Sequence, residues 1–137
     1  MPQVMYHNLT KIAHSHYPVH FLLFVKLHFH KIKNIFFFSV QIQVGEVIKC
    51  EPVPKAKKLL VSQIKIGAET RQIVSGIAKY YKPEEMVGKK VAVITNLKPC
   101  KLCGVESQGM ILAAGDDEGN LSVVTVDKDI VSGSEIC

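Results

Sequence analysis

The sequence predicts an all-β fold, a small five-stranded barrel with one short helix and extra strands near the C-terminus. Two patterns support this prediction: apolar residues alternate over short segments, and glycine, proline or acidic clusters separate one segment from the next. No long helical period follows residue 38. With 137 residues, the chain has room for one domain, or for one domain with a tail.

The first half of this barrel is expected to contain three strands. Residues 40–48 form the first, in which every second residue is apolar until Gly45 interrupts the alternation and predicts a bend. Prolines end this strand, and a lysine-rich loop follows. Residues 60–66 form the second strand, and a turn beginning at Gly67 leads into the third strand at residues 71–77.

The second half is expected to begin with a helical turn. Pro83 suits the first position of a helix, the two glutamates after it favour the positive end of the helix dipole, and Gly88 can end the helix. A fourth strand is expected at residues 91–95, followed by strands at residues 109–114 and 121–126 that enclose an acidic turn. The oligonucleotide-binding (OB) fold is the commonest barrel of this size, so the sequence predicts an OB-fold barrel.

The composition changes near residue 39. All six His and all six Phe lie before it, whereas all nine Gly and all four Cys lie after it. Residues 1–38 are therefore expected to be a basic extension of uncertain structure, and residues 39–137 the folded domain. The apolar run at residues 21–25 ends at Lys26, so the extension is expected to be neither a secretory signal nor a membrane span. Its two His-x-His pairs leave metal chelation as an alternative.

The net charge of +5 is distributed unevenly along the chain. Residues 39–104 contain 12 basic and 5 acidic residues, whereas residues 105–137 contain one basic residue and seven acidic ones. Within one barrel, these two parts predict a positive side and a negative side. A positive side favours an anionic partner such as nucleic acid, and a chance clustering of surface charge is the alternative.

Neither catalysis nor a bound metal or cofactor is expected of the folded domain. It has no glycine-rich phosphate loop, no pairing of a nucleophile with a general base, and no His. Cys100 and Cys103 have the spacing of half a zinc site, but a structural zinc needs four ligands, and the remaining thiols are Cys50 and Cys137. Reduced thiols, as in a cytoplasmic protein, are the favoured interpretation.

Three segments resemble one known family. They are residues 74–78 (Val-Ser-Gly-Ile-Ala), 83–89 (Pro-Glu-Glu-Met-Val-Gly-Lys) and 96–112 (Asn-Leu-Lys-Pro-Cys-Lys-Leu-Cys-Gly-Val-Glu-Ser-Gln-Gly-Met-Ile-Leu). In order and spacing they resemble the tRNA-binding domain at the C-terminus of many bacterial methionyl-tRNA synthetases. Similar domains occur in free-standing tRNA-binding proteins and in the endothelial monocyte-activating polypeptide. The resemblance covers about residues 39–137 and implies a dimeric, non-catalytic OB fold that binds tRNA with little sequence preference.

The resemblance also implies a set of tRNA contacts. Lys98 and Lys101 flank a proline-stiffened loop and would present two ammonium groups to phosphates. Asn96 and Ser107 have short side chains suited to ribose hydroxyls or base edges, and Met110 offers a soft surface to a base. A turn hydrogen bond is the alternative for Ser107, and core packing for Met110. Further lysines of the first hairpin extend the expected electrostatic footprint: Lys55, Lys57, Lys58 and Lys65.

Four positions depart from the pattern of the family, the first of them Gln41, where the family commonly has aspartate. Gln43 stands where the family commonly has a basic residue in its first strand, Cys100 where it usually has arginine, and Cys137 where many members end on a basic residue. Each lost phosphate contact is expected to weaken tRNA affinity and to flatten its dependence on salt.

The function implied is a non-catalytic module that delivers tRNA to the catalytic domain of a methionyl-tRNA synthetase through phosphate and ribose contacts. It is expected to act as a cytoplasmic homodimer, without a membrane as partner. Two alternatives remain open: a dimerisation module of a synthetase with weakened RNA binding, and a peptide-binding chaperone on the same fold.

Overall fold

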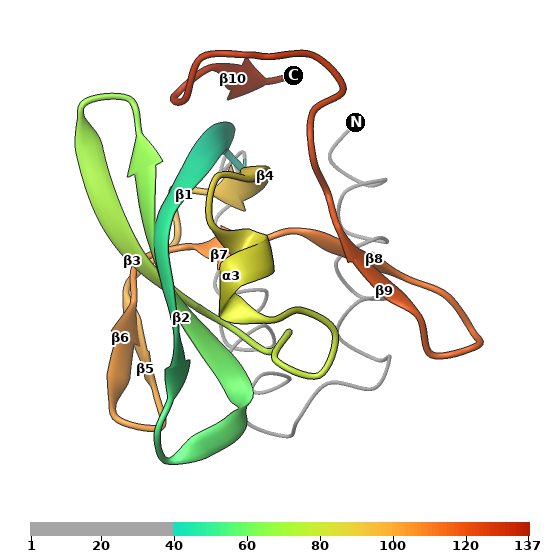
Figure 1. The fold of residues 1–137 in the computed structure, drawn as a ribbon. Coiled ribbons are helices and arrows are strands. Elements are labelled where there is room, and N and C mark those ends of the chain that lie inside the picture. The colour runs from blue at the N-terminus through green and yellow to red at the C-terminus, as the bar shows by residue number, and fades with distance from the viewer. Residues whose placement is uncertain (1–39) are drawn as a thin grey trace.

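The computed structural model describes residues 40–137, so the expectations for residues 1–38 lie outside the described part of the chain. Within residues 40–137, no helix is long and apolar enough to cross a membrane. The described residues are dominated by antiparallel strands, with a single short helical segment between the third and fourth of them (Figure 1).

Six antiparallel strands form the main sheet: five follow the order β3-β2-β1-β4-β7, and β10 pairs with β1 beside this path. These strands are β1 (Ile42–Val53), β2 (Ala56–Ile66), β3 (Glu69–Ser75), β4 (Lys90–Ile94), β7 (Met110–Ile111) and β10 (Glu135–Ile136). Two separate hairpins are formed by β5 (Cys100–Leu102) with β6 (Val105–Ser107), and by β8 (Ala113–Gly115) with β9 (Leu121–Val123). The helix α3 (Pro83–Met86) begins at the predicted proline.

The predicted all-β class with one short helix and extra C-terminal strands is confirmed, although strand ladders do not close the barrel. In place of a ladder between β3 and β7, Gln72 of β3 bonds to Gln108, which follows β6. The Gln108 N–H donates to the Gln72 carbonyl at 2.7 Å, and the Gln72 N–H donates to Gln108 Oε1 at 3.0 Å. Strand β7 has only two residues and pairs with β4, and it forms no ladder with β3.

Strand β1 bends as its sequence predicts. Its first half pairs with β4 and its second half with β2, and the register with β2 shifts between Val47 and Lys49. Gly45 lies where β1 approaches its neighbours closely, since a Cβ atom placed there would lie 2.5 Å from Ile64 Cγ2 and 3.1 Å from Val93 Cγ2. A larger residue at this position would force the strands apart.

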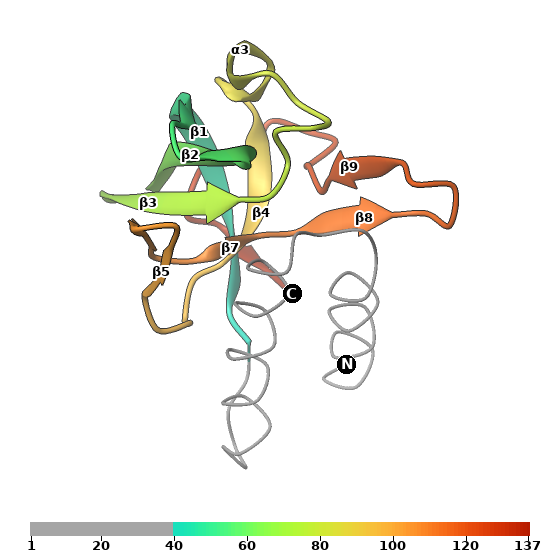
Figure 2. The same cartoon turned by 90° about the horizontal axis from the view of Figure 1, so that it is seen from below.

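Apolar side chains pack on both faces of the sheet. Successive residues of β4 belong in turn to one cluster and then to the other. Val91 and Val93 belong to an inner core that also contains Ile64, Ile73 and the helix residue Met86. Ala92 and Ile94, one residue out of phase, belong to an outer cluster on the opposite face. Figure 2 shows the long strands and the hairpins from below, with α3 at one end of the sheet. A sheet covered on both faces explains why so many consecutive β4 residues are apolar.

The acidic turn expected between β8 and β9 is confirmed. The Asp116 carboxylate accepts hydrogen bonds from the backbone N–H groups of Glu118 at 3.0 Å and Asn120 at 2.9 Å, and from the Asn120 side-chain amide at 2.8 Å. These hydrogen bonds, those from Asn120 foremost, hold the pKa of Asp116 below its usual value. The carboxylate therefore shapes the turn.

Candidate nucleic-acid interface

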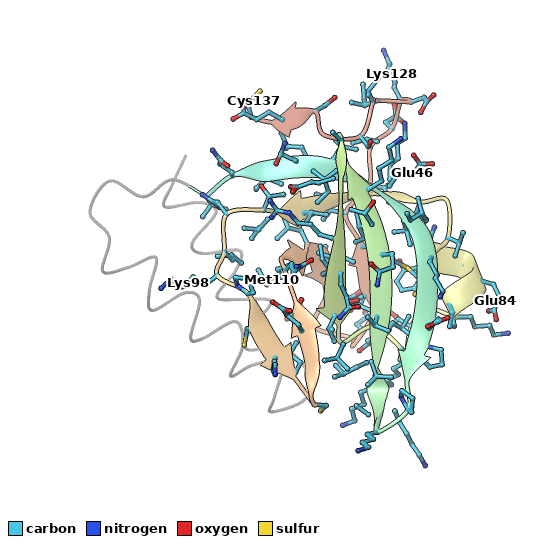
Figure 3. All side chains as sticks on the ribbon, turned by 90° about the vertical axis from the view of Figure 1, so that its left-hand side faces the viewer. Glu46, Glu84, Lys98, Met110, Lys128 and Cys137 are labelled. Carbon is cyan, nitrogen blue, oxygen red and sulfur yellow. The ribbon has the colours of Figure 1, made fainter. Side chains whose placement is uncertain are left out.

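Two segments flank the outer face of β2 and β3, the face opposite the inner core. One is the turn between β1 and β2, and the other is the long connection from β4 to β7. This connection contains the β5–β6 hairpin, which packs against β3 (Figure 3). In OB folds, the two loops at these positions and the strands between them bind oligonucleotides. The topology thus defines a candidate interface before any side chain is considered.

Three exposed lysines, named here the turn lysines, lie at the first of these segments: Lys55, Lys57 and Lys58. Because β2 begins at Ala56, two of them belong to the strand and only Lys55 lies in the turn proper. The carbonyl of Lys58 accepts a hydrogen bond from the N–H of Ala78 at 3.3 Å, so the start of β2 is tied to the segment that follows β3. This hydrogen bond helps to fix the backbone from which the turn lysines project.

Two exposed lysines, named here the hairpin lysines, lie at the second segment: Lys98 and Lys101. Lys98 precedes β5, and Lys101 lies within β5, directly opposite Glu106 of β6. The hairpin itself was not predicted, because strands of three residues are too short to display an alternating pattern. Its formation places the hairpin lysines on a folded support in place of the simple loop that the sequence suggests.

Lys65 is exposed but separate from both groups of lysines. It lies near the far end of β2, opposite Thr70 on one side and Glu46 on the other. A strand rises by about 3.3 Å per residue, which puts Lys65 roughly 26 Å from Lys57 along β2. The structure therefore does not bring all four lysines of the first hairpin together.

The three remaining residues implied by the resemblance lie deeper in the fold. Asn96 is half-buried, and its Oδ1 accepts a hydrogen bond from the Gln41 N–H at 2.9 Å. Ser107 is fully buried, and Met110 packs in the outer cluster beside Ile94. Their side chains connect the hairpin segment to the rest of the domain, so they help to fix the position of the segment that contains the hairpin lysines.

The end of the hairpin is anchored to β3 by amide groups that no sequence pattern marks. Gln72 Nε2 donates to the carbonyl of Glu106 at 2.9 Å, and Gln63 Nε2 donates to Gln72 Oε1 at 3.0 Å. Glutamines at these positions look like ordinary outward-facing strand residues. Only the packing of the hairpin on β3 reveals their role.

The departure at Gln43 has a structural explanation. Its Nε2 donates to the carbonyl of Gly133 at 3.0 Å, and the neighbouring Val44 N–H donates to the carbonyl of Ser134 at 2.9 Å. Gln43 thus holds the C-terminal segment against β1. Gln43 lies opposite Glu135 of β10 and Val93 of β4, and Figure 3 shows Cys137 at the end of this C-terminal segment.

The Cys-x-x-Cys motif belongs to the hairpin. Cys100 lies in β5 opposite Ser107, and Cys103 lies in the turn between β5 and β6. Neither cysteine takes part in a disulfide. Among residues 40–137, no group of three or more His, Cys, Asp or Glu side chains could hold a metal ion.

An OB-like sheet with exposed lysines on both flanking segments is typical of nucleic-acid-binding modules. Residues 42–135 match the family model described as "Putative tRNA binding domain". The chain therefore belongs to this family of tRNA-binding domains, whose members are binding domains and not catalytic ones.

Named relatives support the same assignment. The methionine–tRNA ligase of Methanocaldococcus jannaschii is 64% identical over 98 residues, which is 72% of this chain and 15% of that ligase. The chain thus spans about 15% of the length of the curated relatives that it matches. The resemblance to the tRNA-binding domain of methionyl-tRNA synthetases is confirmed.

Solved structures show the same fold. A crystal structure of a MetRS related protein from Pyrococcus horikoshii aligns with a TM-score of 0.68 and 40% identity, over 72% of this chain and 90% of that one. The chaperone CsaA of Bacillus anthracis aligns with a TM-score of 0.65 over 72% of this chain and 90% of that one. Its identity of 21% makes this a likeness of fold alone.

Proposed function

We propose that this domain binds tRNA through the turn lysines and the hairpin lysines and delivers it to the catalytic domain of a methionyl-tRNA synthetase. The observation that carries the proposal is the placement of both lysine groups on the two segments that flank the outer face of β2 and β3. Lysines at these positions would neutralise phosphates along a folded RNA without reading its sequence.

The other predicted contacts take supporting roles in this proposal. Ser107 and Met110 fix the base of the β5–β6 hairpin, and Asn96 ties the start of the connection to Gln41, the residue before β1. Lys65 adds to the long-range attraction of the anion, since it lies at the far end of β2. The acidic segment after residue 104 would repel RNA from the remaining surface and so orient it.

Fluorescence anisotropy of the full chain with bulk tRNA, titrated across salt and with duplex DNA as competitor, tests the proposal. We expect binding that resists the DNA competitor and weakens with salt. Replacing the hairpin lysines together, Lys98→Ala with Lys101→Ala, should lower affinity and reduce the salt slope by roughly one to two. Lys128→Ala, which removes a cation from the acidic segment, is the matched control and should leave affinity unchanged. Unchanged affinity in the double variant would contradict the proposal.

The same proposal includes a homodimer, supported by exposed apolar side chains on the segment that runs beside β4. Val124, Ile130 and Val131 are 39%, 39% and 76% exposed. The Ala92 N–H donates to the carbonyl of Val124 at 3.0 Å, and Lys90 donates to that of Ile130, so the segment has a fixed place. Exposed apolar side chains on one segment favour self-association, and two copies would bind one tRNA more tightly through avidity.

Sedimentation velocity of the full chain tests the dimer. Val131→Asp should shift the chain to a monomer, because a carboxylate would have to be buried in the contact. Ile48→Asp replaces an exposed apolar residue outside this segment and should leave the dimer intact. A wild-type monomer at micromolar concentration would contradict this part of the proposal. The catalytic partner would be sought in the cytoplasm, where the proposal places the domain.

A further inference from the structure

Arg71 joins the two ends of the segment that contains the β5–β6 hairpin. Its Nη1 donates to the carbonyl of Thr95, at the start of that segment, and lies 3.4 Å from the carbonyl of Gln108, at its end. Its Nε and Nη2 donate to Glu69 Oε1 at 2.8 and 2.7 Å. One guanidinium on β3 therefore touches both places where the hairpin segment leaves and rejoins the sheet.

This arrangement requires the geometry of an arginine. A guanidinium carries five N–H donors in a rigid plane, so it can bond to a carboxylate and to two carbonyls at once. A lysine ammonium has the same charge but sits as a single point on a flexible stem. The sequence contains one arginine against 16 lysines, and it stands at this position.

The burial of the group is consistent with anchoring. The side chain of Arg71 is 24% exposed, whereas its partner Glu69 is 55% exposed. A guanidinium whose donors already bond to Glu69, Thr95 and Gln108 has little capacity left for a phosphate. The exposed lysines on the hairpin are better placed to meet an anion.

We propose that Arg71 is a positioning residue for tRNA binding. By holding Thr95 and Gln108 together, it keeps the hairpin in one orientation, so that Lys98 and Lys101 meet phosphates at a set spacing. The inference rests on the proposed function of the hairpin lysines. A support that is ordered before binding lowers the entropy lost when the complex forms, and loss of that support weakens binding without removing any contacting charge.

Arg71→Lys and Arg71→Met in the full chain test this role by two measurements. The first is tRNA affinity across salt, and the second is hydrogen exchange of backbone amides followed by mass spectrometry without tRNA. Both variants should weaken binding by about tenfold while the salt slope stays that of the wild type. Amide exchange should accelerate in residues 96–108 and remain unchanged in the β1–β2 pairing. Lys128→Met, which changes the net charge alone, should alter neither measurement.

Several outcomes would overturn the inference. If Arg71→Lys binds tRNA with the affinity of the wild type, the positive charge at this position is sufficient for binding and the geometry of the guanidinium is not needed. If exchange in residues 96–108 is unchanged, or if it rises equally throughout the domain, Arg71 does not position the hairpin. If the wild-type chain fails to bind tRNA while the local change in exchange occurs, the anchor exists and the proposed function is wrong.

A second variant keeps the test decisive if both Arg71 variants fail to fold. Glu69→Gln removes the charged partner of the guanidinium at a half-exposed site. It should produce the same changes with a smaller loss of affinity, about threefold. No change in exchange or affinity in a folded Glu69→Gln protein would then count against the inference.

Discussion

The hydroxyl of Ser107 accepts a hydrogen bond from the N–H of Val74 at 3.0 Å and donates one to the carbonyl of Gly109 at 3.0 Å. Ser107 is fully buried, and Val74 is 1% exposed. The edge of β3 that faces away from β2 has no neighbouring strand among residues 40–137. There the Ser107 hydroxyl accepts the hydrogen bond from Val74 that a backbone carbonyl would accept in a ladder. Both of its hydrogen-bonding functions are used within the protein.

Ser107→Ala should therefore destabilise the domain by about 1–3 kcal/mol, because the buried N–H of Val74 would lose its partner. Chemical denaturation followed by circular dichroism measures this free energy of unfolding. Ser122→Ala removes an exposed hydroxyl of β9 and should change stability by less than about 0.5 kcal/mol. Equal effects of the two substitutions would show that the Ser107 hydrogen bonds do not contribute.

Cys103→Asn should stabilise the domain by about 0.5–1 kcal/mol. Cys103 has a φ of 49° and Gly104 a φ of 79°, so both residues of the β5–β6 turn adopt the left-handed region. Asparagine tolerates this region better than cysteine, and Asn-Gly is the preferred pair in such hairpin turns. Thermal denaturation measures the change. Gly104→Ala is the opposite control and should lower stability by about 1 kcal/mol.

The ion pair between Lys90 and Asp129 should make a small, pH-dependent contribution to stability. The side-chain hydrogen bond from Lys90, and then its charge, lower the pKa of Asp129. A depressed pKa in the folded state means that the contribution is present above about pH 4, where the carboxyl of the unfolded chain is ionised. It is lost as the pH falls through the folded pKa.

Asp129→Asn should accordingly lower the melting temperature slightly at pH 7 and leave it unchanged at the acidic end of the folded range. Asp127→Asn is the comparison, since it removes a nearby exposed carboxylate. A difference between Asp129→Asn and wild type that grows as the pH falls would reverse the expected sign and disprove the contribution.

The thiols of the domain should differ in reactivity. Cys50 is 8% exposed, its burial raises the pKa of the thiol, and Ser62 Oγ lies 3.4 Å from its sulfur. Because the thiolate is the reactive form, Cys50 should react with an aromatic disulfide at least tenfold more slowly than exposed Cys103 and Cys137. Mass spectrometry of the labelled peptides identifies each site. In denaturant the three rates should become similar, and rapid labelling of Cys50 in the native protein would contradict its burial.

The candidate site was only partly predictable. Lys55, Lys57, Lys58, Lys98 and Lys101 are exposed as expected, because a lysine seldom gives up its hydration. For Ser107 and Met110 the sequence left two interpretations, since residue type does not reveal which face of a very short strand is buried. The anchoring role of Gln72 needed the register between β3 and the hairpin, which is a contact across 34 residues of sequence.

The sequence by itself determined the all-β class, the bend of β1, the short helix at Pro83 and the tRNA-binding family. These depend on local periodicity, on turn residues and on ordered motifs, which are written in neighbouring positions. Only the tertiary structure decided that ladders leave the barrel open, that Gln43 holds the C-terminal segment, and that Arg71 joins both ends of the hairpin segment. The last two are contacts between residues far apart in the chain, and all three features depend on how the sheet curls.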